Sequence, residues 1–197
     1  MSPILGIWAS SIAPSLNASS YESIATQTVG VGGASSITFS SIPSTYKHLQ
    51  IRAIASSDRT GYVVNNYKMT FNGDTASNYR SHWIIGGYGT TPTADSSNSG
   101  PEGFIYMPTG TTSAASNIFT GMIIDVLDYT NTNKNKTSRN LMGYDVNGTS
   151  GTGSYGGAIS MTSGLWQSTS AISSITLAPE SFNWIRYSSF ALYGIKG

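Results

Sequence analysis

Hydrophobic and polar residues alternate with a period of two along much of the chain, the spacing that puts alternate side chains on opposite faces of a β-strand. The pattern is clearest at residues 48–55, where one face carries Leu49, Ile51, Ala53 and Ala55. It recurs at residues 68–72, where Met69 and Phe71 oppose polar neighbours. These stretches predict half-buried strands.

From residue 21 onward, short segments of this kind are separated by Gly, Asn, Ser, Thr and Pro, and no stretch has the period of an amphipathic helix. The predicted strands are Tyr21–Val29, Ser35–Ile42, His48–Ala55, Val63–Asn72, Tyr79–Tyr88, Gly103–Pro108, Ile118–Tyr129, Arg139–Asn147, Tyr155–Thr162, Ala171–Ala178 and Ser189–Lys196. Many short strands with regular turns favour an all-β fold, an antiparallel β-sandwich of jelly-roll-like form.

Two further features refine this picture. Around Met122–Leu127 both faces are apolar, which predicts a central strand covered on both sides. Spacers rich in turn residues predict exposed loops at Thr90–Gly100, Thr109–Asn117, Thr130–Thr137 and Asn147–Gly153.

Residues 1–20 differ from the rest, because two prolines and a glycine disfavour a helix and no partner strand follows closely. We expect an extended N-terminal arm before a sandwich domain at residues 21–197. The arm carries an apolar cluster of Ile4, Leu5, Ile7 and Trp8, which needs to be buried. It either closes one end of its own domain or grips a neighbouring subunit.

Charge is sparse: only 10% of the 197 residues are charged and the formal net charge is +1. No cluster of Lys and Arg offers phosphate contacts, so nucleic acid is not an expected partner. No apolar run is long enough to span a bilayer, and residues 1–12 lack the basic start of a signal peptide, so we expect neither a membrane nor export. A surface this neutral is easier to keep soluble if an assembly covers part of it.

Groups that carry chemistry are equally sparse, with no cysteine, two histidines and nine acidic residues. His48 and His82 have no third ligand at metal-binding spacing. Asp125 and Asp128 are three residues apart in a predicted strand, so they face opposite sides instead of converging on a substrate. We therefore expect no metal, no cofactor and no enzymatic activity.

Aromatic residues are more informative, since they make up 11% of the chain and are enriched at interfaces. Tyr79, Trp83 and Tyr88 form the best candidate for a surface contact. Strand alternation instead turns Trp83 inward together with Tyr79. Core packing is thus the competing interpretation, as it is for Trp166 and Trp184.

Several stretches together resemble a family of bacteriophage virion proteins, many of them from marine and environmental phages. They are Pro3–Ser11 (PILGIWASS), Tyr21–Thr26 (YESIAT), Ile37–Arg52 (ITFSSIPSTYKHLQIR), Phe71–Ala76 (FNGDTA), Asn78–Arg80 (NYR), Ile124–Tyr129 (IDVLDY), Asn133–Thr137 (NKNKT), Gly164–Trp166 (GLW) and Ser188–Gly197 (SSFALYGIKG). The resemblance covers nearly the whole chain, and its closing FALYGIK is the most specific part. It implies a structural component of the phage particle with a β-sandwich body, and it carries over no catalytic residue.

The resemblance leaves the position on the particle open. The leading expectation is a non-enzymatic capsid decoration or cement subunit, held to the major capsid protein through its arm. A homotrimer is expected from how such particles are commonly built, and the protein would be found in the virion after assembly in the bacterial cytoplasm. The alternative is a tail-fibre or tail-tip module that binds host-surface glycan through its loops. A glycan-degrading enzyme is the third reading.

Overall fold

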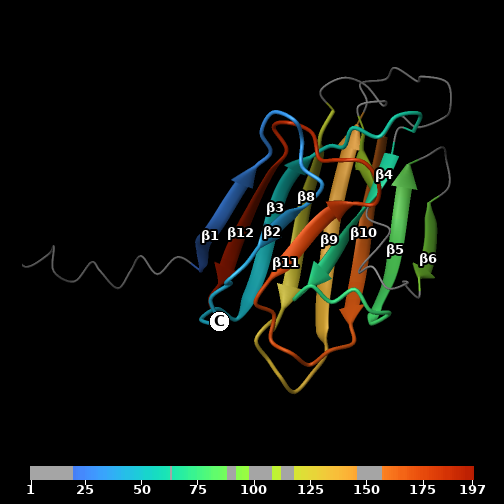
Figure 1. Ribbon diagram of the computed structural model, residues 1–197. Coiled ribbons are helices and arrows are strands. Elements are labelled where there is room, and N and C mark those ends of the chain that lie inside the picture. The colour runs from blue at the N-terminus through green and yellow to red at the C-terminus, as the bar shows by residue number, and fades with distance from the viewer. Residues whose placement is uncertain (1–19, 63, 88–91, 98–107, 112–117, 146–156) are drawn as a thin grey trace, which may run out of the picture.

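The computed structural model describes residues 20–62, 64–87, 92–97, 108–111, 118–145 and 157–197, and in these residues all regular structure is β-strand (Figure 1). The strands are β1 (Tyr21–Thr28), β2 (Ile37–Phe39), β3 (His48–Ala55), β4 (Val64–Phe71), β5 (Tyr79–Gly87), β6 (Thr93–Ser97), β7 (Pro108–Gly110), β8 (Thr120–Leu127), β9 (Lys136–Asp145), β10 (Gly157–Trp166), β11 (Ile175–Pro179) and β12 (Ser189–Ile195). No helix long and apolar enough to cross a membrane occurs in these residues.

The strands form two antiparallel sheets that pack face to face (Figure 1). The large sheet has the order β1-β12-β3-β8-β9-β10-β5-β6, and the small sheet the order β2-β11-β4-β7. The predicted all-β antiparallel sandwich is therefore confirmed. The jelly-roll description stays a prediction, and the expected arm lies almost wholly outside the described residues.

Ten of the eleven predicted strands coincide with observed ones, and the remaining one, Gly103–Pro108, falls almost wholly outside the described residues. One loop prediction is wrong, because β6 lies inside Thr90–Gly100. β6 is an edge strand of the large sheet, and the side chains of its residues 93–96 are exposed. An edge strand with no buried face needs no hydrophobic alternation, so the pattern did not reveal it.

The core lies between the sheets and is rich in aromatic rings. The Trp184 ring packs 5.3 Å from Phe190 between centroids, and its Nε1 donates to the Leu177 carbonyl at 3.2 Å. The Trp166 ring stacks on Tyr79 at 6.3 Å. Trp166 and Trp184 are thus core residues, as the packing interpretation predicts.

Two halves of the large sheet fill its inner face differently. In the β3–β8 half (β12, β3 and β8), the residues of the hydrophobic core are Leu49, Ile51, Ala53, Ala55, Met122, Ile124, Val126, Phe190 and Leu192. In the β9–β10 half (β9, β10 and β5), the buried positions mix Trp and Met with the polar residues Ser81, Lys136, Ser138, Asn140, Ser160 and Thr162. Burial alone therefore does not separate apolar from polar positions here.

The turn between β8 and β9 joins the two halves and is held by charged groups. Lys47 and Lys134 both bind the Asp128 carboxylate, the first at 3.0 Å. Hydrogen bonds from Lys134 and then Lys47 lower the pKa of Asp128 to about 2. The buried Lys136 ammonium donates to the carbonyls of Asn131, Lys134 and Thr169 at 2.6, 3.0 and 2.9 Å.

Candidate functional site

The outer face of the large sheet, turned away from the small sheet, carries a group of exposed aliphatic side chains. We call this group the apolar face; its members, each 42–59% exposed, are Ile54, Ile84, Ile123, Leu141, Ile159 and Met161. They are six of the eleven large hydrophobic residues that are exposed in the described part of the chain. Because so many gather on one surface, they make this face the candidate site for contact with a partner.

Strand register explains how residues from five strands come together. Ile123 on β8 lies opposite Leu141 on β9, Leu141 opposite Met161 on β10, and Met161 opposite Ile84 on β5. Directly opposite side chains in a sheet have Cβ atoms about 5 Å apart. The four therefore form one continuous apolar row across the sheet.

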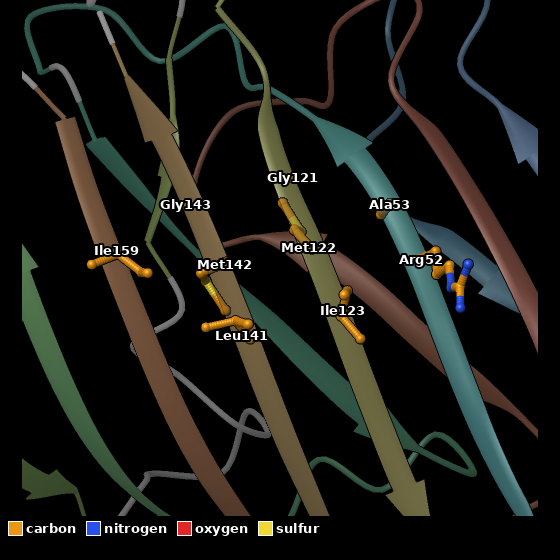
Figure 2. Close-up of a pocket in the computed structure, with 9 residues that line it drawn as sticks. All are labelled: Arg52, Ala53, Gly121, Met122, Ile123, Leu141, Met142, Gly143 and Ile159. Atoms are coloured by element: carbon orange, nitrogen blue, oxygen red, sulfur yellow. The ribbon is translucent and has the colours of Figure 1, made fainter.

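A second row, one step along the strands, contains a hollow. Here Gly121 lies opposite Gly143, with Ile54 and Ile159 on either side. The hollow has a volume of about 400 Å³ and is lined by Arg52, Ala53, Gly121, Met122, Ile123, Leu141, Met142, Gly143 and Ile159 (Figure 2). A Cβ atom placed on Gly121 would meet no heavy atom within 4 Å. Two opposed glycines thus open what we call the glycine hollow.

Polar groups border the apolar face toward β1. Gln50 Nε2 donates to Asp125 Oδ1 at 2.8 Å, and Arg52 Nε donates to Gln50 Oε1 at 2.8 Å. The Arg52 guanidinium also lies over the rings of Tyr21 and Tyr193, 5.7 and 5.6 Å from their centroids. This network holds Arg52 at the rim of the hollow.

The lining of the glycine hollow is almost wholly apolar, since Arg52 is the only charged residue in it. An activated nucleophile or a general acid requires a titratable group at the site, and the lining residues supply none. Burial of aliphatic surface is what this arrangement offers.

The histidines and acids considered from the sequence lie elsewhere. His48 Nδ1 accepts the backbone N–H of Asp128 at 2.9 Å, and His82 is exposed on β5. Asp125 binds Gln50, whereas Asp128 binds two lysines, so the two carboxylates serve different contacts. Within the described ranges, no group of three or more His, Cys, Asp or Glu is placed to hold a metal ion.

The candidate aromatic surface is wrong for two of its three residues. Tyr79 and Trp83 are buried on the inner face of β5. Burial raises the pKa of Tyr79 to about 12, and its hydroxyl donates to the Asp74 carbonyl at 2.9 Å. Strand alternation, which turned both side chains inward, is the correct interpretation. Tyr88 and the arm residues Ile4, Leu5, Ile7 and Trp8 lie outside the described residues.

The apolar face was not among the predicted sites, although the sequence held one signal of it. Residues 122–127 are apolar on both faces, which we interpreted as a strand covered on both sides. That interpretation is wrong for the outer face, where Ile123 is 42% exposed. The five remaining members cannot be found without the register, because they come from four different strands.

Comparisons of the chain with protein-family models, with curated proteins and with solved structures give no match. The resemblance to phage virion proteins therefore stays an expectation. The functional proposal depends on that resemblance and on the geometry of the apolar face.

Proposed function

We propose that the protein is a non-enzymatic structural subunit of a bacteriophage particle, of the capsid decoration or cement type, which attaches to neighbouring subunits through its apolar face. The observation that carries the proposal is the clustering of six exposed aliphatic side chains on one sheet face. Fully burying such a side chain contributes roughly 1.5–3 kcal/mol before the costs of association. Several such side chains on one surface are enough to attach a subunit stably.

Two further features support this proposal. One sheet contains the order β1-β12-β3-β8, and the other has the order β2-β11-β4-β7. From β1 to β4 the chain therefore alternates between the two sheets. This is the alternation expected of jelly rolls, which occur in viral capsid and lectin domains. In addition, Arg52 is the only charge around the hollow, which suits permanent contact better than catalysis. The expected partner is the shell protein, and the expected location is the virion.

The proposal is tested first by counting copies per particle in purified phage that encodes this chain, by quantitative mass spectrometry. Hundreds of copies are expected for a decoration subunit. A few copies to a few tens would place the protein on the tail instead and overturn the capsid assignment.

A second test asks whether the apolar face makes the contact. Ile159→Asp and Met161→Asp put a charge into the face, so we expect particle occupancy to fall at least tenfold when each variant is added to undecorated particles. Val31→Asp is the matched control, because Val31 is 83% exposed but lies between β1 and β2, away from this face. Full occupancy by the two face variants would contradict the proposed contact.

A further inference from the structure

The glycine hollow has the shape of a site for one large ring. Gly121 and Gly143 lie opposite each other, with Ile54 and Ile159 on either side. A Cβ atom placed on Gly121 would meet no heavy atom within 4 Å, and one on Gly143 would meet the Ala158 carbonyl oxygen at 3.4 Å. Exposed glycines in a sheet are commonly covered by an aromatic side chain, which shields the backbone and restores packing. An aromatic residue with aliphatic neighbours is therefore the occupant that this hollow fits.

The chain itself carries a segment of this composition outside the described sandwich. Nineteen residues precede Ser20, and they include Ile4, Leu5, Ile7 and Trp8 but no Asp, Glu, Lys or Arg. The other three tryptophans, Trp83, Trp166 and Trp184, are buried in the sandwich. An uncharged segment matches a hollow with a single charge at its rim.

The position of the hollow leaves it within reach of the chain's own N-terminal segment as well as that of another copy. The chain enters the sheet at Tyr21, which pairs with Ile195 and through it with His48. On β3 the hollow begins at Arg52, about 13 Å further along the strand, and it extends over β8 and β9 to Ile159 on β10. Twelve residues reach about 40 Å when extended, so length alone does not decide.

The route across the sheet does decide between the two sources. The direct path from Tyr21 to the hollow crosses β12 and β3, where Arg52 lies over the rings of Tyr21 and Tyr193 and Gln50 is hydrogen-bonded to Asp125. Covering those polar groups with an apolar segment costs desolvation. A segment of another copy can approach over β10 and β5, where Met161 and Ile84 continue the apolar face.

We infer that the glycine hollow binds residues Ile4–Trp8 of a second copy of this chain, with the Trp8 ring over Gly121 and Gly143. This inference rests on the proposed function, because it names the partner segment that covers part of the apolar face. It makes each subunit both a donor of an arm and an acceptor of one.

Gly121→Val in the full chain is the sharpest test. The added side chain fills the hollow, yet its Cβ meets no heavy atom within 4 Å, so the fold is expected to be kept and strand propensity improved. We expect sedimentation velocity to show loss of self-association, with at least a tenfold weaker association constant. Ser163→Val is the control, because it adds the same side chain to an exposed outer position of β10 away from the hollow.

Trp8 provides a second readout, because it is one of four tryptophans and the other three are buried. In associated wild-type protein, acrylamide should quench little of the fluorescence. In Gly121→Val, and in wild-type protein diluted to monomer, the quenchable share should rise toward one tryptophan in four. A monomer whose Trp8 stays protected at every dilution would mean that the segment folds back on its own sheet, and would overturn the second-copy assignment.

A mixing experiment completes the test. Trp8→Ser keeps the hollow but lacks the ring, and Gly121→Val keeps the ring but lacks the hollow. Each variant alone should be monomeric. A mixture should form heterodimers in which the arm of the Gly121→Val variant binds the hollow of the Trp8→Ser variant. Failure of the mixture to associate overturns the inference. The proposed function is judged separately, by the copy number per particle and by the occupancy of Ile159→Asp and Met161→Asp.

Discussion

The β3–β8 half and the β9–β10 half of the large sheet divide polar and apolar residues between their faces differently. In the β3–β8 half, aliphatic and aromatic side chains face the small sheet, and the outer face holds the Gln50–Asp125 network. In the β9–β10 half, Ser138, Ser160 and other polar residues are buried, whereas Leu141 and Met161 are exposed. Side chains thus alternate between the two faces in both halves, but in the β9–β10 half several polar residues lie on the inner face and several aliphatic ones on the outer face.

The difference separates two uses of hydrophobic residues. In the β3–β8 half, most hydrophobic side chains are buried between the sheets, where they stabilise the fold. The β9–β10 half places several of them in solvent, where they contribute little to the fold of a single subunit and are available for a partner. Removing an apolar side chain should therefore lower stability most on the inner face of the β3–β8 half and least on the outer face of the β9–β10 half.

The largest effect on stability is expected in the β3–β8 half. Phe190→Ala removes a fully buried ring that packs on Trp184, so the free energy of unfolding should fall by about 3–5 kcal/mol. Urea denaturation followed by fluorescence measures it. Met161→Ala, on the outer face of the other half, is the comparison and should lower stability by less than about 1 kcal/mol. Equal losses in the two variants would remove the distinction between the halves.

The turn that joins the halves should give the next largest effect. Lys136→Met leaves the carbonyls of Asn131, Lys134 and Thr169 without their buried donor. We expect the free energy of unfolding to fall by about 2–4 kcal/mol, since each unsatisfied buried acceptor is costly. Lys134→Met is the control, because Lys134 is exposed and its loss should cost less than about 1 kcal/mol. A Lys136 variant as stable as the control would show that water replaces the ammonium.

On the polar inner face of the β9–β10 half, one substitution is expected to raise the free energy of unfolding. The Ser160 hydroxyl is buried and has no hydrogen-bond partner in the described structure. Ser160→Ala removes that unmet donor and acceptor, so the free energy of unfolding should rise by about 1 kcal/mol. Thermal unfolding measures the change, and Ser163→Ala on the exposed side of the same strand should leave the midpoint unaltered. A loss of stability in Ser160→Ala would mean that the hydroxyl is solvated.

The smallest effect concerns pH. The pKa of Asp128 is lowered to about 2 in the folded protein, so its ion pairs contribute stability above the ordinary carboxyl range and lose it as pH falls from about 4 to about 2. The contribution should be no more than about 1 kcal/mol, because both lysines are exposed. Comparing wild type with Asp128→Asn by urea denaturation at pH 7 and pH 3 tests this. A constant difference between the two proteins across that range would refute the assignment.

The strands could be predicted from the sequence because alternation is a local property. The alternation of Leu49, Ile51 and Ala53 with polar neighbours indicates within a few residues that they share one face. Which face of a strand turns toward the core depends on the tertiary arrangement. Alternation therefore did not reveal that Leu141 and Met161 lie on the outer face. Burial of Trp83 followed correctly from alternation, whereas its role as a surface aromatic did not.

The candidate site needed the register as well. Gly121 and Gly143 are far apart in the sequence, and either glycine alone predicts only a weak point in a strand. Their pairing across β8 and β9 creates the hollow, and only the tertiary arrangement fixes it. The edge strand β6 escaped detection for a related reason, since its residues bury no face of their own.

The two outermost strands of the large sheet also limit how copies can aggregate. Pairing in β1 shifts register between Ser23 and Ala25, an irregularity that hinders a further strand from adding alongside. At the opposite margin, β6 presents Asp95 and other exposed polar side chains. Backbone-to-backbone growth into amyloid-like fibrils is therefore disfavoured at both margins, so this weakly charged, strand-rich chain can reach high concentration without polymerising into ribbons.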